Sequence, residues 1–324
     1  MRETMSKKMY SNMKNTSYKN EQAKRQAQLI ERGSFVFYGA RNRGVASWKN
    51  KNGLVEEGES STVLKQDDRE KNLYAPIRED VIKYVKNAKI SWWHMANESN
   101  REVSAHTLSS QVSCFNHLFL IRNDEVAIKT VLKEATGILF DEILPSFIED
   151  NTLISFEFVF DNKHLLNENY EIRGAKCTSV DALIHARKGE VKWLIPIEWK
   201  YTEAYDQSAE CFTNYHRYEN MVSEHSRLPS WQDLYHKDPF YELARQTLLM
   251  EKIIDIHPDI ANKFFHIIVI PEGNKEMRDD AEIFGFSLKQ HETNSYQIIS
   301  PSDLLLPIKD LYPNLIEYLD TRYW

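Results

Sequence analysis

Three consecutive segments in the middle of the chain alternate apolar and polar residues with a period of two, the pattern of β-strands. They read "TLISFEFVFD", "KCTSVDALIHAR" and "KWLIPIEWKYTE", at residues 152–161, 176–187 and 192–203. The connection "RKGEV" between the last two is short and contains Gly189, which suits a hairpin turn. The sequence therefore predicts three strands that neighbour one another in a sheet.

Helical patterns precede and follow these strands. "IREDVIKYVKNA" after Pro76 predicts one helix, and "AIKTVLKEATGILFDEILPSF" predicts a second that ends at Pro145. "DPFYELARQTLLMEKIID" predicts a third, with Asp238 as N-cap and Pro239 in the first turn, before a short buried strand in "NKFFHIIVIPEG". The order helix, three strands, helix, strand predicts an α/β fold with a mixed central β-sheet flanked by α-helices.

Charge is distributed unevenly along the chain. Residues 1–51 hold 12 Lys and Arg against three Glu, a net charge of +9, whereas the remainder carries -16. "KNEQAKRQAQLIER" predicts a helix with few apolar positions, which we expect to pack lightly or to dock on a partner. Glycine and polar residues from Gly39 to Ser61 predict a loop. We expect a basic N-terminal arm and loop at 1–75, able to follow a phosphate backbone or simply solvated, and one folded domain at 76–324.

Other residue patterns exclude several classes of protein. Cys114, Cys177 and Cys211 have neither zinc-site nor CxxC spacing, so we expect small buried thiols. The histidines form no HExxH pattern, and no phosphate-cradling glycine motif is present, which excludes a zinc hydrolase and nucleoside triphosphate hydrolysis within this chain. Apolar runs fall far short of the ~20 residues that span a bilayer, so we expect no membrane partner and a cytoplasmic location.

Polar residues on two neighbouring predicted strands carry the candidate chemistry. Asp181 lies on the polar face of one strand, and Glu198 and Lys200 lie on the polar face of the next, opposite Trp193 and Trp199. If the strands form a hairpin, Asp181 and Glu198 can supply the hard oxygen ligands that Mg²⁺ prefers. The Lys200 ammonium can then orient the attacking water and offset negative charge in the transition state. The alternative is an exposed ion pair on a solvated strand face.

One proline complicates this arrangement. Pro196 precedes Glu198 and lacks the N–H that a central strand uses in its ladder. We expect a β-bulge there, which would re-aim Glu198 toward the metal. If Pro196 instead marks an edge strand, the convergence with Asp181 would be lost.

The spacing from Asp181 across sixteen residues to Glu198-Trp199-Lys200 resembles the PD-(D/E)xK nuclease superfamily, with Val180-Asp181 and "EWK" in place of the literal motif. The segments "SSQVSCFN", "CTSVDALI" and "IEWKYTE" look like a bacterial branch of restriction-type endonucleases. The resemblance covers Pro76 to about Ile270. It implies a restriction endonuclease-like core of order αβββαβ and a Mg²⁺-dependent endonuclease that cuts double-stranded DNA in restriction-type defence. Cutting two strands further implies a homodimer.

The resemblance also suggests further site residues. Members of the superfamily often add an upstream acid, for which Glu134, Glu142 and Glu157 are candidates. We prefer Glu157, because it lies on the polar face of the first strand, whereas the other two fall on a predicted helix. Three polar residues of the following helix are candidates for contact with the scissile phosphate, unless they are ordinary surface residues: Tyr241, Arg245 and Gln246. For Gln111 and Asn116 in "SSQVSCFN" we expect core or cap hydrogen bonds.

Other functions stay open at this point. A DNA repair or junction-resolving nuclease would use the same residues. A non-catalytic DNA-binding protein of the same fold would be expected to have lost the acids or the lysine, whereas Asp181, Glu198 and Lys200 are all present. A protein without any nucleic-acid role would bind DNA no better than background and without salt dependence.

Overall fold

The computed structural model describes residues 16–49, 54–93, 101–149, 151–160, 165–168, 177–205, 216–222, 226–230, 233–289 and 295–324. These residues pack into two compact units. We call Thr16–Ile121 together with Ile308–Trp324 the terminal unit, and Arg122–Pro307 the sheet unit. The two units are defined by packing. The boundary expected at residue 75 instead separates a basic arm from a nuclease domain by function, so that boundary stays a prediction.

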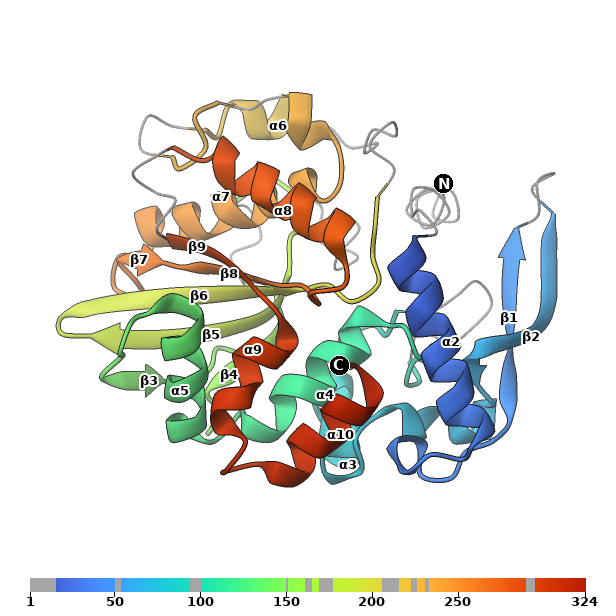
Figure 1. Ribbon diagram of the computed structural model, residues 1–324. Coiled ribbons are helices and arrows are strands. Elements are labelled where there is room, and N and C mark those ends of the chain that lie inside the picture. Colours follow the sequence, from blue (N-terminus) through green and yellow to red (C-terminus); the bar gives the residue numbers. More distant parts are fainter. Residues whose placement is uncertain are drawn as a thin grey trace. The chain divides into compact units, whose positions relative to one another are not determined.

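The described residues of the sheet unit contain one seven-stranded mixed sheet of order β3-β5-β6-β8-β9, in which β4 also pairs with β5 and β7 with β6. Helices α7 and α8 lie over one face and α5 and α9 over the other (Figure 1). The predicted α/β fold, a mixed central sheet flanked by helices, is confirmed. The elements are β3 (Glu142–Leu144), β4 (Ile154–Phe158), β5 (Val180–Lys188), β6 (Val191–Trp199), β7 (Lys263–Phe264), β8 (His266–Val269), β9 (Tyr296–Ile299), α5 (Glu125–Thr136), α6 (His216–Glu219), α7 (Phe240–Ile256), α8 (Lys275–Ser287) and α9 (Pro301–Leu305).

The hairpin of β5 and β6 forms the centre of this sheet. Its antiparallel ladder runs from Ala182↔Ile197 to Lys188↔Val191. The two-residue turn places Gly189 at a φ of 58°, in the left-handed region that glycine tolerates best. On the far side of β5 lies antiparallel β4, and β8 pairs parallel with β6 after the crossover through α7. The predicted order of helices and strands is therefore confirmed.

Pro196 lies in a central strand and pairs with β5 without any register shift. The bulge expected there is wrong for this fully described strand, and so is the edge-strand alternative, because β7 and β8 pair with the other side of β6. The carbonyl of Leu194 and the N–H of Lys200 both bond toward that side, so the alternate residue Pro196 also faces it. Proline has no N–H to donate on that side. The position that would accept such a bond lies in the gap between β7, which ends at Phe264, and β8, which begins at His266.

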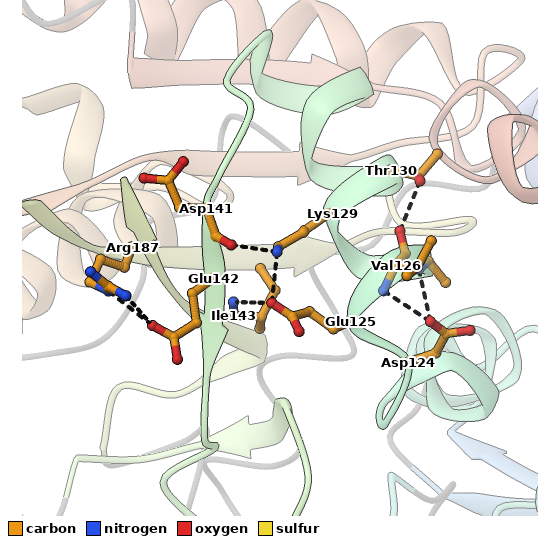
Figure 2. Close-up of polar contacts among 10 residues, drawn as sticks. Asp124, Glu125, Val126, Lys129, Thr130, Asp141, Glu142, Ile143 and Arg187 are labelled. Atoms are coloured by element: carbon orange, nitrogen blue, oxygen red, sulfur yellow. Dashed lines mark hydrogen bonds and ion pairs between the residues drawn. The ribbon is translucent and has the colours of Figure 1, made fainter. Parts of the chain in front are cut away.

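The segment before the first strand of the predicted series is not one long helix. Helix α5 ends at Thr136, because Gly137 adopts a left-handed conformation with a φ of 69°. The prediction that the helix continues to Pro145 is wrong, and Glu142–Leu144 form the edge strand β3 instead. Figure 2 shows the polar contacts that hold this edge: Lys129 with the Asp141 carbonyl, Glu125 with the N–H of Ile143, and Glu142 with Arg187 at 2.7 Å.

Helix α7 follows the prediction except at its start. Its N-cap is Pro239, so the prediction of Asp238 as N-cap is wrong. The remainder of the helix is buried on several sides, including Tyr241, Arg245 and Gln246. This burial matters for the candidate site described below.

The terminal unit departs from prediction in its first half. Helix α2 (Ser17–Glu31) is confirmed, but the loop predicted from Gly39 to Ser61 is wrong, because a hairpin of β1 (Arg43–Lys49) and β2 (Val55–Leu64) occupies most of it. Nor does α2 lie loosely on the protein, because Arg25 donates to three carbonyls at the end of α10. The unit's other helices of eight or more residues are α3 (Arg78–Asn87), α4 (Ser110–Leu118) and α10 (Pro313–Arg322).

Buried polar groups in the terminal unit behave as expected. The side chain of Asn116 accepts from the N–H of Tyr74 at 2.8 Å and donates to the Asn72 carbonyl, and Gln111 bonds the backbone of Ser91 and Trp93. The prediction of core hydrogen bonding for both side chains is confirmed.

The cysteines and helices bear on two further expectations. Cys114 and Cys177 are buried free thiols, as predicted, and Cys211 lies outside the described residues. Across the described ranges, every helix is too short or too polar to cross a membrane.

Candidate active site

The end of the β5–β6 ladder brings the predicted acids together. The ladder stops at Ala182↔Ile197, so Asp181 and Glu198 are the next opposed positions. The Asp181 carboxylate takes over from the ladder there, since Oδ2 accepts the Trp199 N–H at 2.7 Å. A side chain of β5 thus reaches into β6 between Glu198 and Lys200.

Lys200 joins this site from one pleat further along the chain. Its side chain is buried, and Nζ lies 2.6 Å from Glu198 Oε1 and 2.5 Å from Glu242 Oε2. Burial opposes the charged form of the lysine, but the carboxylates of Glu198 and Glu242 outweigh it and raise the pKa of Lys200 well above its ordinary value. We call Asp181, Glu198, Lys200 and Glu242 the acid cluster.

The carboxylates of the cluster are not equivalent. Burial raises the pKa of Glu198 well above its ordinary value, and the nearby charges of Asp181 and Glu242 add to that effect. Burial likewise raises the pKa of Asp181, with a further contribution from Glu157. Burial also acts on Glu242, but Lys200 prevails there and lowers the pKa of that carboxyl. The cluster therefore holds more carboxylates than one ammonium can neutralise.

Glu157 lies beside the cluster on β4. The β4–β5 pairs Phe156↔Ala182 and Phe158↔Val180 enclose the position where Glu157 faces Asp181. Its backbone has a φ of 49°, a left-handed conformation that is costly for a residue with a side chain. This non-glycine strain occurs directly opposite the candidate metal ligand.

The other two candidate upstream acids lie elsewhere in the sheet unit. Glu134 is exposed on α5, and Glu142 on β3 pairs with Arg187, at the opposite end of β5 from Asp181. Neither side chain has a described contact with the acid cluster. The preference for Glu157 stays a prediction, now with a position next to Asp181.

The three residues predicted on the following helix are buried and belong to two different networks. Gln246 donates to Glu198 Oε2 at 2.6 Å and is part of the surroundings of the acid cluster. Tyr241 and Arg245 lie beside Glu168 instead: the guanidinium lies 4.6 Å from the centre of the Tyr241 ring, and Arg245 Nη1 is 3.8 Å from Glu168 Oε1. Their contact with a phosphate stays a prediction.

Sequence reasoning missed Glu242 and His266. Glu242 precedes Gln246 by four residues on α7, so both side chains project from one side of the helix toward the polar face of β6. Two polar residues at that spacing, in the mostly apolar first half of the helix, were a usable signal. His266 gave no such signal, because its contact with Gln246 depends on how β8 and α7 pack.

The donor set of the cluster fits a divalent cation of the hard type. Among the described residues, no group of three or more His, Cys, Asp or Glu side chains is arranged so that it could hold a metal ion. Asp181 and Glu198 nevertheless offer neighbouring carboxylate oxygens, and a cation would stabilise the charged forms that burial and nearby acids disfavour. Mg²⁺ commonly binds through one or two carboxylates and completes its shell with water and phosphate oxygens.

The fold and this cluster together define a restriction endonuclease-like α/β protein. A family model described as "Restriction Endonuclease associating with ARP" matches residues 23–324, and the chain belongs to that family. No curated protein and no solved structure matches the chain significantly. The family describes nucleases, and the match covers both units of the structure.

Proposed function

We propose that the protein is a Mg²⁺-dependent endonuclease of the PD-(D/E)xK type, which hydrolyses phosphodiester bonds of double-stranded DNA in restriction-type defence. The observation that carries this proposal is the meeting of Asp181 and Glu198 at the end of the β5–β6 ladder, with Lys200 bonded to Glu198 at 2.6 Å. Membership of a restriction endonuclease family supports the choice of DNA as substrate.

Each residue of the cluster has a role in this chemistry. Asp181 and Glu198 would hold Mg²⁺, with Glu157 as the preferred additional acid. When bound, the ion supplies Lewis-acid polarisation of the phosphate and a more acidic water. The water oxygen forms the new bond to phosphorus while the bond to one sugar oxygen breaks, without a covalent enzyme intermediate. Lys200, charged and buried, orients that water by hydrogen bonding and offsets the negative charge that develops on the phosphate.

Glu242 would hold Lys200 in place. The lysine Nζ lies between Glu198 on its own strand and Glu242 on α7, so it is held from two elements. A long flexible side chain loses much of its rotamer freedom in such an arrangement, which preorganises the ammonium for the water. Glu242 is thus a positioning residue in this proposal.

Arg245 and Tyr241 remain candidates for substrate contact. Arg245 Nε forms no hydrogen bond among the described residues, so the guanidinium retains donor capacity for a phosphate oxygen. The Tyr241 ring packs against the guanidinium and limits its orientation.

Cutting of both strands would further require two copies of the site, which we propose a homodimer supplies. The description of the family also suggests a protein partner, ARP, for this chain.

Cleavage of DNA with Mg²⁺ tests the proposal. Native protein, Asp181→Asn and Lys200→Ala are incubated with several genomic and plasmid DNAs, so that a sequence-specific enzyme meets its site. Glu134→Gln, which changes an exposed acid of α5, is the matched control. We expect cutting by the native protein and the control only. Equal cutting by all four proteins would overturn the assignment of the site.

The same series distinguishes the non-catalytic alternative. A protein that only binds DNA would leave every substrate intact while its affinity falls with salt. The retention of both acids and the lysine in one cluster, with Glu198 and Lys200 buried, supports the catalytic reading. A junction-resolving or repair enzyme would instead cut branched or damaged DNA and leave intact duplexes untouched.

A further inference from the structure

We propose that His266 is a positioning residue for Glu198 and acts through the side-chain amide of Gln246. This inference rests on the proposed metal site, because it concerns how one ligand of that site is held. The three residues come from β8, α7 and β6. Since β6 and β8 pair in parallel with Glu198 opposite Ile268, the alternate residue His266 shares the sheet face of Glu198.

The contacts of Gln246 fix the orientation of its amide. Nε2 donates to Glu198 Oε2 at 2.6 Å and to the Ser179 carbonyl at 2.9 Å, while Oε1 lies 3.1 Å from His266 Nε2. The Ser179 carbonyl can only accept, so the amino group must face it and Glu198 Oε2. The carbonyl Oε1 is thereby turned to the histidine, which must donate.

The histidine can donate from Nε2 in only one neutral form. His266 is 2% exposed, and burial together with the charge of Arg227 lowers its pKa to about 3, so the ring is neutral near pH 7. Its Nδ1 has no hydrogen-bond partner within the described part of the chain. The single ring proton on Nε2 therefore serves Gln246, whereas a proton on Nδ1 would leave a lone pair facing the Gln246 oxygen.

This chain of contacts from His266 through Gln246 to Glu198, which we call the relay, determines how the Glu198 carboxylate is oriented in the acid cluster. One carboxylate oxygen, Oε2, is held by Gln246, and the other, Oε1, faces Lys200. Without a donor at position 266, the Gln246 amide can rotate and place its oxygen against the carboxylate, which would push Glu198 out of position. Loss of an outer hydrogen bond to a metal ligand typically costs 10–100-fold in metal affinity.

Isothermal titration of Mn²⁺ into the full-length protein without DNA tests the relay independently of cleavage. The key pair is His266→Leu, which removes the donor, and His266→Gln, whose amide nitrogen can occupy the place of Nε2. We expect about tenfold weaker Mn²⁺ binding for the leucine variant and at most about threefold for the glutamine variant. His185→Leu is the matched control, because this β5 histidine donates from Nε2 to the Ile260 carbonyl at 2.9 Å and has no described contact with Gln246 or Glu198.

A second measurement covers the case in which His266→Leu fails to fold. Gln246→Met keeps about the same side-chain volume and removes all three amide contacts, so it should weaken Mn²⁺ binding as His266→Leu would. In the metal-free native protein, ¹⁵N NMR of labelled histidine should show His266 as the neutral Nε2–H tautomer from pH 8 down to about pH 4. An Nδ1–H tautomer would overturn the relay.

Asp181→Asn separates failure of the relay from failure of the proposed metal site. Loss of Mn²⁺ binding in Asp181→Asn, with native affinity in His266→Leu and Gln246→Met, would overturn the relay and leave the metal site standing. Native affinity in Asp181→Asn would overturn the metal site, and the relay with it. Weakened binding in all three variants, with recovery in His266→Gln, supports both.

Discussion

Replacing Asp181 by Asn should stabilise the metal-free protein while it abolishes cleavage. The Asp181 carboxylate lies beside Glu198 and Glu157; burial and the charge of Glu157 raise its pKa, and Lys200 and the Trp199 N–H offset part of this. Two carboxylates about 5 Å apart repel by roughly 3 kcal/mol at an effective dielectric constant of about 20, and the lysine offsets part of this. Asparagine removes the charge and keeps an oxygen that can accept the Trp199 N–H.

The substitution of Asp181 by Asn weakens one hydrogen bond only slightly. The 2.7 Å hydrogen bond from Trp199 becomes a bond to a neutral oxygen, which costs about 1 kcal/mol. The net expectation is therefore a stabilisation of about 1–2 kcal/mol. In a unit of this size, that corresponds to a rise in Tm of roughly 3–6 °C.

Thermal unfolding followed by circular dichroism, in EDTA and in Mg²⁺, measures the effect. Asp141→Asn is the matched control, because Asp141 is exposed and its Oδ2 accepts the Gly189 N–H at the same 2.7 Å (Figure 2). We expect little change in Tm for the control. In Mg²⁺ at about tenfold Kd, ion binding should stabilise the native protein by about 1.4 kcal/mol and leave Asp181→Asn unchanged. The difference in Tm between the two proteins should therefore become smaller than in EDTA. A fall in Tm for Asp181→Asn in EDTA would refute the reasoning.

Four further predictions concern charge and backbone. Because burial raises the pKa of Glu198, the folding stability that this group contributes is fully present below the ordinary carboxyl pKa and is lost as pH rises through the raised value. In denaturant titrations between pH 5 and 8, metal-free Glu198→Gln should therefore lose less stability than the native protein. The pKa of Glu242 is lowered, so the folding stability that this group contributes is present above the ordinary carboxyl pKa and is lost as pH falls. In the same titrations, Glu242→Gln should therefore lose less stability than the native protein as the pH is lowered. Lys200→Met should abolish cleavage and destabilise the metal-free protein by about 2–3 kcal/mol, less than for a fully buried pair because the Glu242 side chain is 31% exposed; a native urea midpoint would contradict this. Gly189→Ala should cost about 1 kcal/mol through its left-handed φ without altering Mn²⁺ affinity.

The sequence was informative where local pattern and tertiary structure agree. Alternation over 152–203 predicted the strands, and the short connection containing Gly189 predicted the hairpin that makes Asp181 and Glu198 opposed positions. The same period of two identified the polar face on which Glu198 and Lys200 lie. Both features depend only on backbone geometry and on neighbouring segments, so one sequence suffices for them.

Predictions failed where a signal was ambiguous. Residues 127–147 contain helix-forming residues on both sides of Gly137, and the glycine, not Pro145, ends the helix. The polar and glycine residues from Gly39 to Ser61 resemble a loop, yet they form a hairpin in which Gly44 lies against the Leu64 backbone. Pro196 appeared to demand a bulge, although the interruption between β7 and β8 leaves it without a ladder partner to lose.

The contacts that complete the candidate site join segments that are distant in sequence. Glu242 meets Lys200 across 42 residues, and His266 meets Gln246 across 20. Such pairs depend on the rotation of α7 about its axis and on its position over the sheet. Periodicity can indicate that Glu242 and Gln246 share one side of the helix, but packing decides which strand that side meets.

Two unfavourable features coincide at the end of the β5–β6 ladder, and their coincidence is informative. Glu157 holds a left-handed backbone on one side of Asp181, and the carboxylate of Glu198 lies on the other. Either feature alone costs on the order of 1–3 kcal/mol, and neither contributes to the packing of the apolar core. Replacement of Glu157 by Gly should therefore stabilise the metal-free protein, since glycine adopts this φ freely and removes one charge beside Asp181. If that substitution also lowers Mn²⁺ affinity, the strained backbone serves to direct the Glu157 carboxylate toward the metal; unchanged affinity would exclude Glu157 from the ligand set.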